Sequence, residues 1–192
     1  MLEPLGQSQV LAYVKRLAVG QIIHLISYEK TEDWRNLPER ERIQYEMSSA
    51  GIQWHPLRYH KRPSALATSW DIAIGTVVGL WLTLRYSLEI VHARSYVASA
   101  IALAIKRLTG AKFVFDMRGF WADERVDGEL WLRNGRMFQV AKWFEKRFLL
   151  EANHVITLTN AAVTEIRRFD YLQGRMPVFT VIPTCADLSR FR

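Results

Sequence analysis

The chain has 192 residues, of which 49% are hydrophobic and 23% are charged. This length and composition allow a sizeable buried core and exclude an intrinsically disordered chain. The formal net charge of +7 favours acidic partners such as phosphates, anionic lipid surfaces or nucleic acid, although a merely solubilising surface carries the same charge. The single cysteine, Cys185, excludes an internal disulfide and a cysteine-based metal cluster, and it is typical of a reducing compartment.

Strand and helix patterns alternate along the chain. Short apolar runs predict strands, whereas apolar residues three or four positions apart predict helices, the first of them capped by Ser8. In chain order the sequence predicts helix 9–18, strand 21–27, a polar connection at 29–33, helix 37–50, strand 53–59, helix 68–86, strand 90–93, helix 97–108, strand 113–116, helix 136–151, strand 155–158, helix 160–169 and strand 178–182. Such alternation is typical of βαβ units, so we predict an α/β fold with a Rossmann-like doubly wound parallel sheet.

The longest apolar run covers residues 72–84, between Asp71 and Arg85. A helix needs about 20 apolar residues to span a bilayer, so we expect a buried core helix here and no membrane span. The first residues show neither a positive leader nor an apolar signal core, so we expect no targeting segment. A role at a membrane surface stays open.

A charged loop follows the apolar strand at residues 113–116 and extends to Gly128. In an open parallel sheet, ligands bind outside the carboxyl ends of the strands. Asp116 and Arg118 stand at the end of this strand, and Arg94 and Ser95 stand at the end of the preceding one. We expect all four to face the same crevice. The alternative is a solvated loop in which the charged side chains pair with one another.

Several well-known catalytic patterns are missing from the sequence. It contains no G-x-G-x-x-G after a strand, no P-loop and no G-x-S-x-G, which argues against a dinucleotide enzyme, a P-loop nucleotidase and an α/β hydrolase. The five histidines, at positions 24, 55, 60, 92 and 154, do not pair at metal-ligand spacing. We therefore predict no metal site and interpret the histidines in strands as core or edge residues.

Six segments, taken in order, resemble the N-terminal half of glycosyltransferase family 4. They are EPLGQSQV, HLISYEK, WHPLRYHKRPS, VHARSY, FVFDMRGFWADERVDG and VIPTCADLSRF. The resemblance implies one lobe of a GT-B enzyme, in which two Rossmann-like domains face each other across a cleft. Residues 1–182 would form the N-terminal, acceptor-binding domain, and residues 183–192 would begin the interdomain linker. The C-terminal domain that binds the nucleotide-sugar donor would then be absent from this chain.

The resemblance also assigns roles to residues at two places. The segment containing Gly6, Gln7 and Ser8 matches the turn whose backbone approaches the donor phosphates. Asp116 matches the polar residue beside the reacting centre, and Arg118 would pair with a phosphate or orient Asp116. The family transfers sugars with retention of configuration and usually without metal. The resemblance therefore implies no cofactor, with the nucleotide-sugar as a substrate.

A basic and aromatic segment contains His55, Arg58, His60 and Lys61. We expect it to form an acceptor-side patch that holds an anionic lipid-linked or phosphorylated acceptor, or that rests against an anionic membrane surface. The alternative is an exposed connection with a few buried aromatic rings.

Three functions follow from these observations. The leading one is the acceptor lobe of a retaining glycosyltransferase acting on a glycan or lipid-linked acceptor, inactive without its donor lobe. The second is a free-standing Rossmann-like binding module that docks to a separate donor lobe or another partner. The third, a nucleic-acid binder, has no RNA- or DNA-binding motif behind it, so we expect no nucleic-acid partner. We expect a cytoplasmic protein, either dissolved or peripheral to the inner face of the membrane.

Members of the resembled family carry an apolar strand directly before the segment EPLG. In the Rossmann order this first strand lies in the middle of the sheet, between residues 22–27 and 90–93. We therefore expect the chain to lack its first strand. The two flanking strands should then lie about 10 Å apart or be collapsed together.

Overall fold

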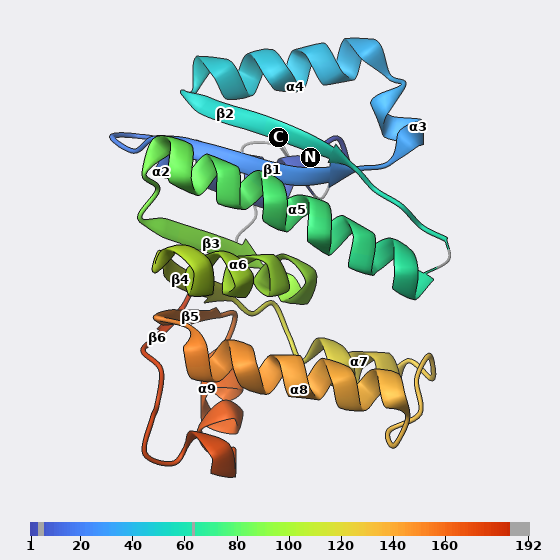
Figure 1. Cartoon of the computed structure of the whole chain (residues 1–192), viewed down its shortest axis with the longest axis vertical. Coiled ribbons are helices and arrows are strands. Elements are labelled where there is room, and N and C mark those ends of the chain that lie inside the picture. The colour runs from blue at the N-terminus through green and yellow to red at the C-terminus, as the bar shows by residue number, and fades with distance from the viewer. Residues whose placement is uncertain (4–5, 63, 185–192) are drawn as a thin grey trace, which may run out of the picture. The chain divides into compact units, whose positions relative to one another are not determined.

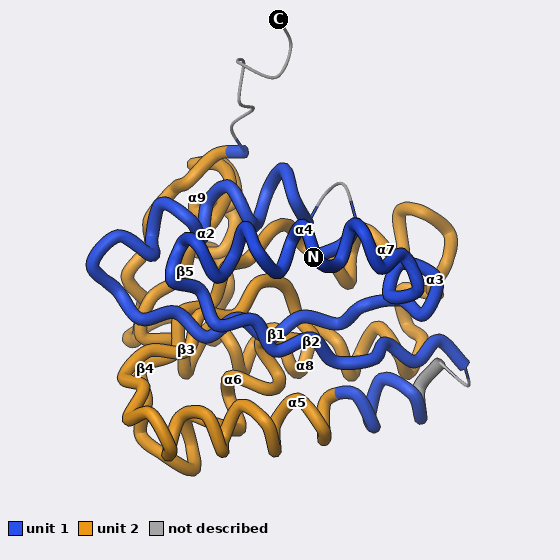
Figure 2. Tube along the Cα trace, turned by 90° about the horizontal axis from the view of Figure 1, so that it is seen from above, with its two compact units in different colours: residues 1–71, 184–192 blue, residues 72–183 orange. Residues whose placement is uncertain are grey.

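The protein is an α/β chain in two compact units, as seen in a computed structural model that describes residues 1–3, 6–62 and 64–184 (Figure 1). The first unit comprises Met1–Asp71 and Thr184–Arg192, and the second comprises Ile72–Pro183 (Figure 2). Residues 185–192 of the expected linker lie outside the described residues, as do positions 4, 5 and 63. Each unit contains its own parallel sheet and its own apolar core.

The first unit is built around two parallel strands. Its elements are η1 (Gln7–Leu11, a π-helix), α2 (Ala12–Leu17), β1 (Ile23–Glu29), α3 (Thr31–Trp34), α4 (Leu37–Ser49) and β2 (Ile52–Arg58). Strand β1 pairs with β2 in register from Ile23 opposite Ile52 to Glu29 opposite Arg58. Apolar side chains from the start of the chain, η1, α2, α4 and β2 form the core: Leu2, Leu11, Val14, Ile43, Met47 and Ile52.

The second unit contains four strands in sequential order. Its elements are β3 (Ile90–Arg94), α6 (Ser95–Thr109), β4 (Lys112–Asp116), α7 (Trp121–Asp127), α8 (Arg136–Glu151), β5 (His154–Thr157), α9 (Asn160–Arg167), η2 (Asp170–Leu172) and β6 (Phe179–Val181). The sheet order is β3-β4-β5-β6, and every pair is parallel. All four carboxyl ends therefore lie along one edge of this sheet. Helix α5 (Ser64–Tyr86) runs from the first unit into the second.

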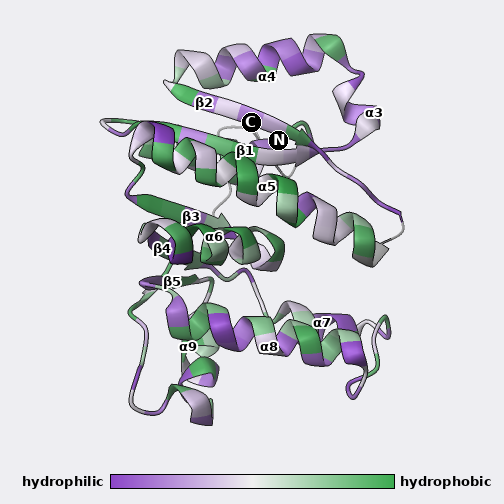
Figure 3. Cartoon of the chain, in the orientation of Figure 1, coloured by the Kyte–Doolittle hydropathy of each residue, from purple (hydrophilic) through white to green (hydrophobic). Residues whose placement is uncertain are grey.

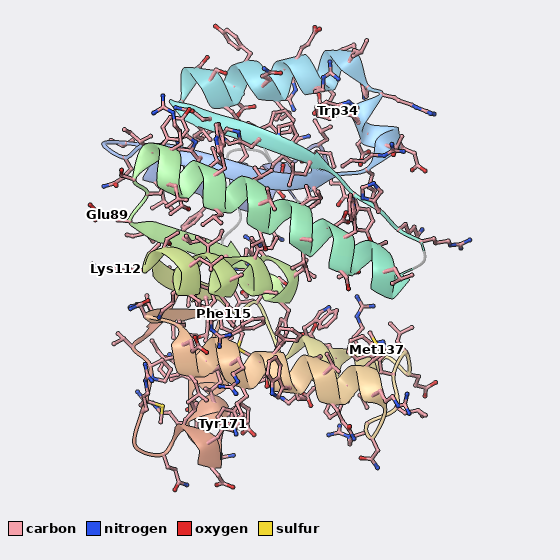
Figure 4. All side chains as sticks on the ribbon, viewed as in Figure 1. Trp34, Glu89, Lys112, Phe115, Met137 and Tyr171 are labelled. Atoms are coloured by element: carbon pink, nitrogen blue, oxygen red, sulfur yellow. The ribbon has the colours of Figure 1, made fainter. Side chains whose placement is uncertain are left out.

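An aromatic cluster holds the second sheet to its helices. Phe113 and Phe115 on β4 are fully buried and lie on the same face because side chains two positions apart in a strand share a face. The ring of Phe148 on α8 lies 5.4 Å from the ring of Phe115 and 6.0 Å from that of Tyr96 on α6 (Phe115 is labelled in Figure 4). Strand β4 is thus fixed from two helices at once.

The order and type of the main elements confirm the sequence prediction, and four details correct it. Ser8 does not cap the first helix but lies inside η1, after Gly6, which has helical dihedral angles and no side-chain cap. Residues 29–33 are not an open polar connection, since Glu29 ends β1, is buried, and accepts hydrogen bonds from the Leu2 amide and the Ser27 hydroxyl. The short helices α3 and α7 were not predicted, because four to seven residues carry too little periodicity.

Helix α5 is the fourth correction. We expected a buried core helix. Only a third of the most apolar 18-residue stretch of this helix is buried, however, and Trp70, Val77 and Trp81 are exposed. By length and composition alone, Leu66–Tyr86 is long enough to cross a membrane, although the 13-residue run 72–84 is not. The sequence showed how apolar the helix is, but not which of its faces the fold would cover.

The described strands do not form one continuous sheet. Within the described ranges, β1 and β2 form one sheet, and β3, β4, β5 and β6 form a second sheet in that order. The spacing that we expect between the strand at residues 22–27 and the strand at residues 90–93 stays a prediction, as does the missing first strand.

Phe148→Ala should destabilise the second unit by about 3–5 kcal/mol, because it opens a cavity among the rings of the core. Val140→Ala on the exposed face of the same helix should change the free energy of unfolding by less than about 0.5 kcal/mol. Urea unfolding of both variants, followed by circular dichroism, checks this. Equal losses for the two variants would show that α8 is not anchored through Phe148.

Candidate functional site

Asp116 ends strand β4 as a buried carboxylate with an incomplete set of partners. Its side chain is only 8% exposed. Oδ1 lies 3.7 Å from Nη1 of Arg118, and Oδ2 lies 3.6 Å from Nε2 of His92. Both distances are too long for hydrogen bonds, and among the described residues Oδ1 accepts none. Asp116 is therefore flanked by Arg118 and His92, while one of its oxygens keeps its capacity to accept a hydrogen bond.

His92 is a neighbour of Asp116 that the sequence analysis missed. It was interpreted as a core or edge histidine of its strand. In the register of the sheet, His92 stands opposite Val114 and Arg94 stands opposite Asp116, so His92 is a diagonal neighbour of Asp116 across the strand pair. The register of β3 on β4 would have revealed this contact, but a single sequence does not specify it.

Arg94 and Ser95 lie at the same edge, as expected. Arg94 is the register partner of Asp116, and Ser95 follows it as the first residue of α6. Ser95 has a φ angle of 71°, in the left-handed region that residues with a side chain rarely adopt. Its carbonyl oxygen accepts a hydrogen bond from the Ser99 hydroxyl at 2.7 Å. The structure thus brings together Arg94, Ser95, Asp116 and Arg118, the four residues that the sequence placed at one crevice.

A hollow of about 670 Å³ adjoins Arg118. It lies beyond the carboxyl ends of β4 and β5, between the loop that follows β4 and helices α7, α8 and α9. Its lining combines aromatic rings, four carboxylates and two cations: Phe120, Phe169, Asp123, Glu124, Asp127, Glu165, Arg118 and Lys142. The charged loop that follows β4 therefore lines one side of this hollow.

Lys142 is fixed in this wall by two carboxylates. Its Nζ donates to Oδ2 of Asp123 at 3.0 Å and to the carboxylate of Glu145, which also accepts from the hydroxyl of Tyr96. Burial lowers the pKa of Lys142, but its hydrogen bonds and charge interactions with Glu145 and Asp123 outweigh burial and raise the pKa overall. Burial raises the pKa of Tyr96, and the charge of Glu145 adds to the effect. Lys142 is therefore a permanent cation and Tyr96 a neutral donor.

The expected donor-phosphate segment is engaged within the first unit. The side-chain amide nitrogen of Gln7 donates to Oε1 of Glu39 at 2.7 Å and to the Leu2 carbonyl at 3.1 Å. The side-chain oxygen of Gln7 accepts a hydrogen bond from Arg42. A Cβ on Gly6 would lie 3.0 Å from Cα of Met1, so the backbone of the first unit alone explains a glycine there. Ser8 lies in η1. A phosphate-binding role for these three residues stays a prediction.

The expected acceptor-side segment is not a single loop. His55 and Arg58 belong to strand β2, because the strand continues through both positions. The rings of His55 and His24 stack with centroids 5.2 Å apart, and Nδ1 of His24 lies 3.0 Å from Nε2 of His55. Nδ1 of His60 lies 2.6 Å from Oδ1 of buried Asp71, whereas Lys61 is exposed. Both histidines of this segment thus have partners within the protein.

No group of three or more histidine, cysteine, aspartate or glutamate side chains among the described residues is arranged to hold a metal ion. The fold is that of an α/β lobe with Asp116 at the carboxyl edge of its parallel sheet, the edge at which ligands of such folds generally bind.

Comparison with known proteins specifies the family. The sequence matches the family described as "Glycosyl transferase 4-like domain" over residues 10–184, and the chain belongs to this family. A crystal structure of Glycyrrhiza uralensis UGT73P12 complexed with glycyrrhetinic acid 3-O-monoglucuronide is similar in fold, with a TM-score of 0.55 and 11% sequence identity. The similarity covers 90% of this chain and 45% of that one, so this chain spans less than half of the protein that it matches. The comparison with curated proteins found no match.

The stacked histidines of β1 and β2 should make the stability of the first unit depend on pH. Burial lowers the pKa of His24, and burial together with the charge of His24 lowers the pKa of His55. The unfolded chain therefore takes up protons first, so stability is fully present above a pH of about 6.5 and is lost as pH falls below it. His55→Gln should flatten this dependence in urea unfolding between neutral and mildly acidic pH. A variant with the same slope as the unaltered protein would contradict the assignment.

Proposed function

We propose that this chain is the acceptor-side lobe of a retaining glycosyltransferase that moves a sugar from a nucleotide-sugar donor to a glycan or lipid-linked acceptor. Membership of the glycosyl transferase 4-like family supports the reaction class. The observation that carries the proposal is the buried Asp116, whose Oδ1 has no hydrogen-bond partner among the described residues. A buried acceptor oxygen without a donor costs about 1–3 kcal/mol, a cost that a bound hydroxyl donor removes.

Asp116 would act on the acceptor rather than form a covalent intermediate. A hydroxyl group that donates to Oδ1 is oriented for attack, and the desolvated carboxylate also stabilises positive charge that develops on the sugar ring. Arg118 and His92, at 3.7 and 3.6 Å, flank the carboxylate and help to keep it in place. A donor phosphate that pairs with Arg118 would have to do so outside the hollow, whose lining carries more carboxylates than cations.

The hollow favours a hydroxyl-rich and uncharged part of the acceptor. Four carboxylates and two cations line it, so a phosphate inside would meet an excess of negative charge. Carboxylates accept hydrogen bonds from sugar hydroxyls, and the rings of Phe120 and Phe169 offer apolar surface to the faces of a sugar. Any anionic part of the acceptor would then lie outside this hollow.

Donor binding would require a second lobe in addition to the one that these residues form. The chain covers 45% of the matched structure, and reaction requires both substrates to be held in one geometry. We propose no metal or organic cofactor, with the nucleotide-sugar entering as a substrate.

In a protein that contains both lobes, Asp116→Asn should lower turnover about 10²–10³-fold, because it removes a charge that acts in the transition state. Stability should change by less than about 1 kcal/mol, since Oδ1 of Asp116 accepts no hydrogen bond from the described residues. Asp170→Asn, an exposed acid on η2, serves as the control and should leave turnover unchanged. Unchanged turnover in Asp116→Asn, measured by release of the nucleotide product, would reassign Asp116 to a structural ion pair with Arg118.

The 192-residue chain alone should show no measurable transferase activity with nucleotide-sugars, because it covers less than half of the matched structure and transfer requires both substrates to be held in one geometry. The assay follows nucleotide release and glycan extension for a panel of donors and acceptors. Sustained turnover would refute the proposal that the acceptor and the donor bind to separate lobes. Glycan binding without turnover, before and after addition of a donor lobe, would support the free-standing binding module instead.

A further inference from the structure

Helix α5 presents a continuous apolar stripe to solvent. The residues of the stripe lie three or four positions apart and are Leu66, Trp70, Ala73, Val77, Trp81 and Leu84. At 3.6 residues per turn they fall within an arc of about 80° and extend for about 27 Å along the helix. Trp70 is 58% exposed, Val77 65%, Trp81 57% and Leu84 65%. Apolar residues recur along the whole helix (Figure 3). Such a stripe on a soluble domain normally marks an interaction surface.

The opposite face of α5 is covered by protein. Asp71, Gly75, Gly79, Leu82 and Thr83 are buried. The Asp71 carboxylate accepts from the His60 amide at 3.0 Å, and its carbonyl oxygen accepts from the hydroxyl of Tyr28. A helix that crossed the bilayer alone would have to expose this carboxylate to lipid at high cost. The helix is therefore suited to lie along a surface rather than to pass through one.

Charge and aromatic side chains at the ends of the helix indicate the kind of surface. The exposed positions of α5 carry no carboxylate, Lys61 and Arg62 precede the helix, and Arg85 lies near its end. The ring of Trp81 meets that of Tyr86 at 6.3 Å, and the guanidinium of Arg85 lies 5.5 Å from the ring of Tyr86. Tryptophan, tyrosine and basic residues around an apolar stripe are typical of the boundary between lipid headgroups and acyl chains.

We propose that the exposed face of α5 docks flat on an anionic lipid bilayer, with its apolar stripe at the level of the upper acyl chains and its basic ends among the headgroups. This proposal does not depend on the proposed function. A second copy of the chain fits the face poorly. Antiparallel packing of two α5 helices would bring Arg85 of one copy to Lys61 and Arg62 of the other, and no carboxylate on the face would compensate.

Vesicle sedimentation tests the surface with matched variants. We expect the full chain to bind vesicles of phosphatidylcholine mixed with phosphatidylglycerol, to bind phosphatidylcholine alone more weakly, and to dissociate as salt is raised. Val77→Asp with Trp81→Asp should lower the partition coefficient about tenfold or more. Val140→Asp with Trp143→Asp is the control, because this valine and tryptophan of α8 are 52% and 51% exposed, and it should bind like the unaltered chain. Circular dichroism confirms that each variant is folded.

Depth measurements test the orientation without relying on those variants. Ala73→Cys and Leu84→Cys, each in a Cys185→Ser background, place a spin label on the stripe at sites about 16 Å apart along the helix axis. A flat helix gives both labels the same shallow depth in anionic vesicles. Depths that differ by most of that separation would show a spanning helix and overturn the proposal. Absence of binding to anionic vesicles, equal losses for the α5 and α8 variants, or concentration-dependent dimers that bury the labels in place of vesicle binding would overturn it as well.

Discussion

Burial of strand β4 is the constraint on which the candidate site depends. Phe113 and Phe115 can be covered only if α6 and α8 both pack on the sheet, and the ring of Phe148 meets them from α8. The same packing carries the end of the strand into the interior, so Asp116 is buried with few partners. The stability of the apolar core therefore offsets the cost of a partly unsatisfied carboxylate, which would be difficult to keep at a less rigid position.

The hollow is connected to this core through polar contacts as well as through the apolar packing of Met117, Phe120 and Phe169. Glu145 is fully buried on α8 and accepts from both Tyr96 and Lys142, and Lys142 reaches Asp123 on α7. Helix α7 has only seven residues, too few to be stable by itself, so this ion pair helps to hold it in place. The wall of the cavity and the aromatic core are thus joined in one network, with each buried charge compensated.

The sequence predicted what depends on local pattern and missed what depends on pairing. The strand at residues 113–116 and the helix at residues 136–151 were located from periodicity and length, and so was the place of Asp116 at the carboxyl end of its strand. The contact between His92 and Asp116 required the register of two strands, which a single sequence does not specify. The exposure of α5 required knowledge of which face the fold covers. His55 was assigned to an acceptor-side patch although it lies within the strand predicted at residues 53–59, and its stacking on His24 depends on the pairing of two strands.

The left-handed backbone at Ser95 limits how this corner of the protein can evolve. A residue with a side chain at a φ of 71° carries a conformational cost of about 1–3 kcal/mol, which rises steeply for β-branched side chains. Short residues such as serine, asparagine, aspartate and glycine can occupy the position. Valine or isoleucine would force the backbone out of the left-handed region and so shift the end of β3 relative to Asp116. Sequence variation in this lineage is therefore expected to gather on the exposed walls of the hollow, while the corner between β3 and α6 stays restricted to a few small residues.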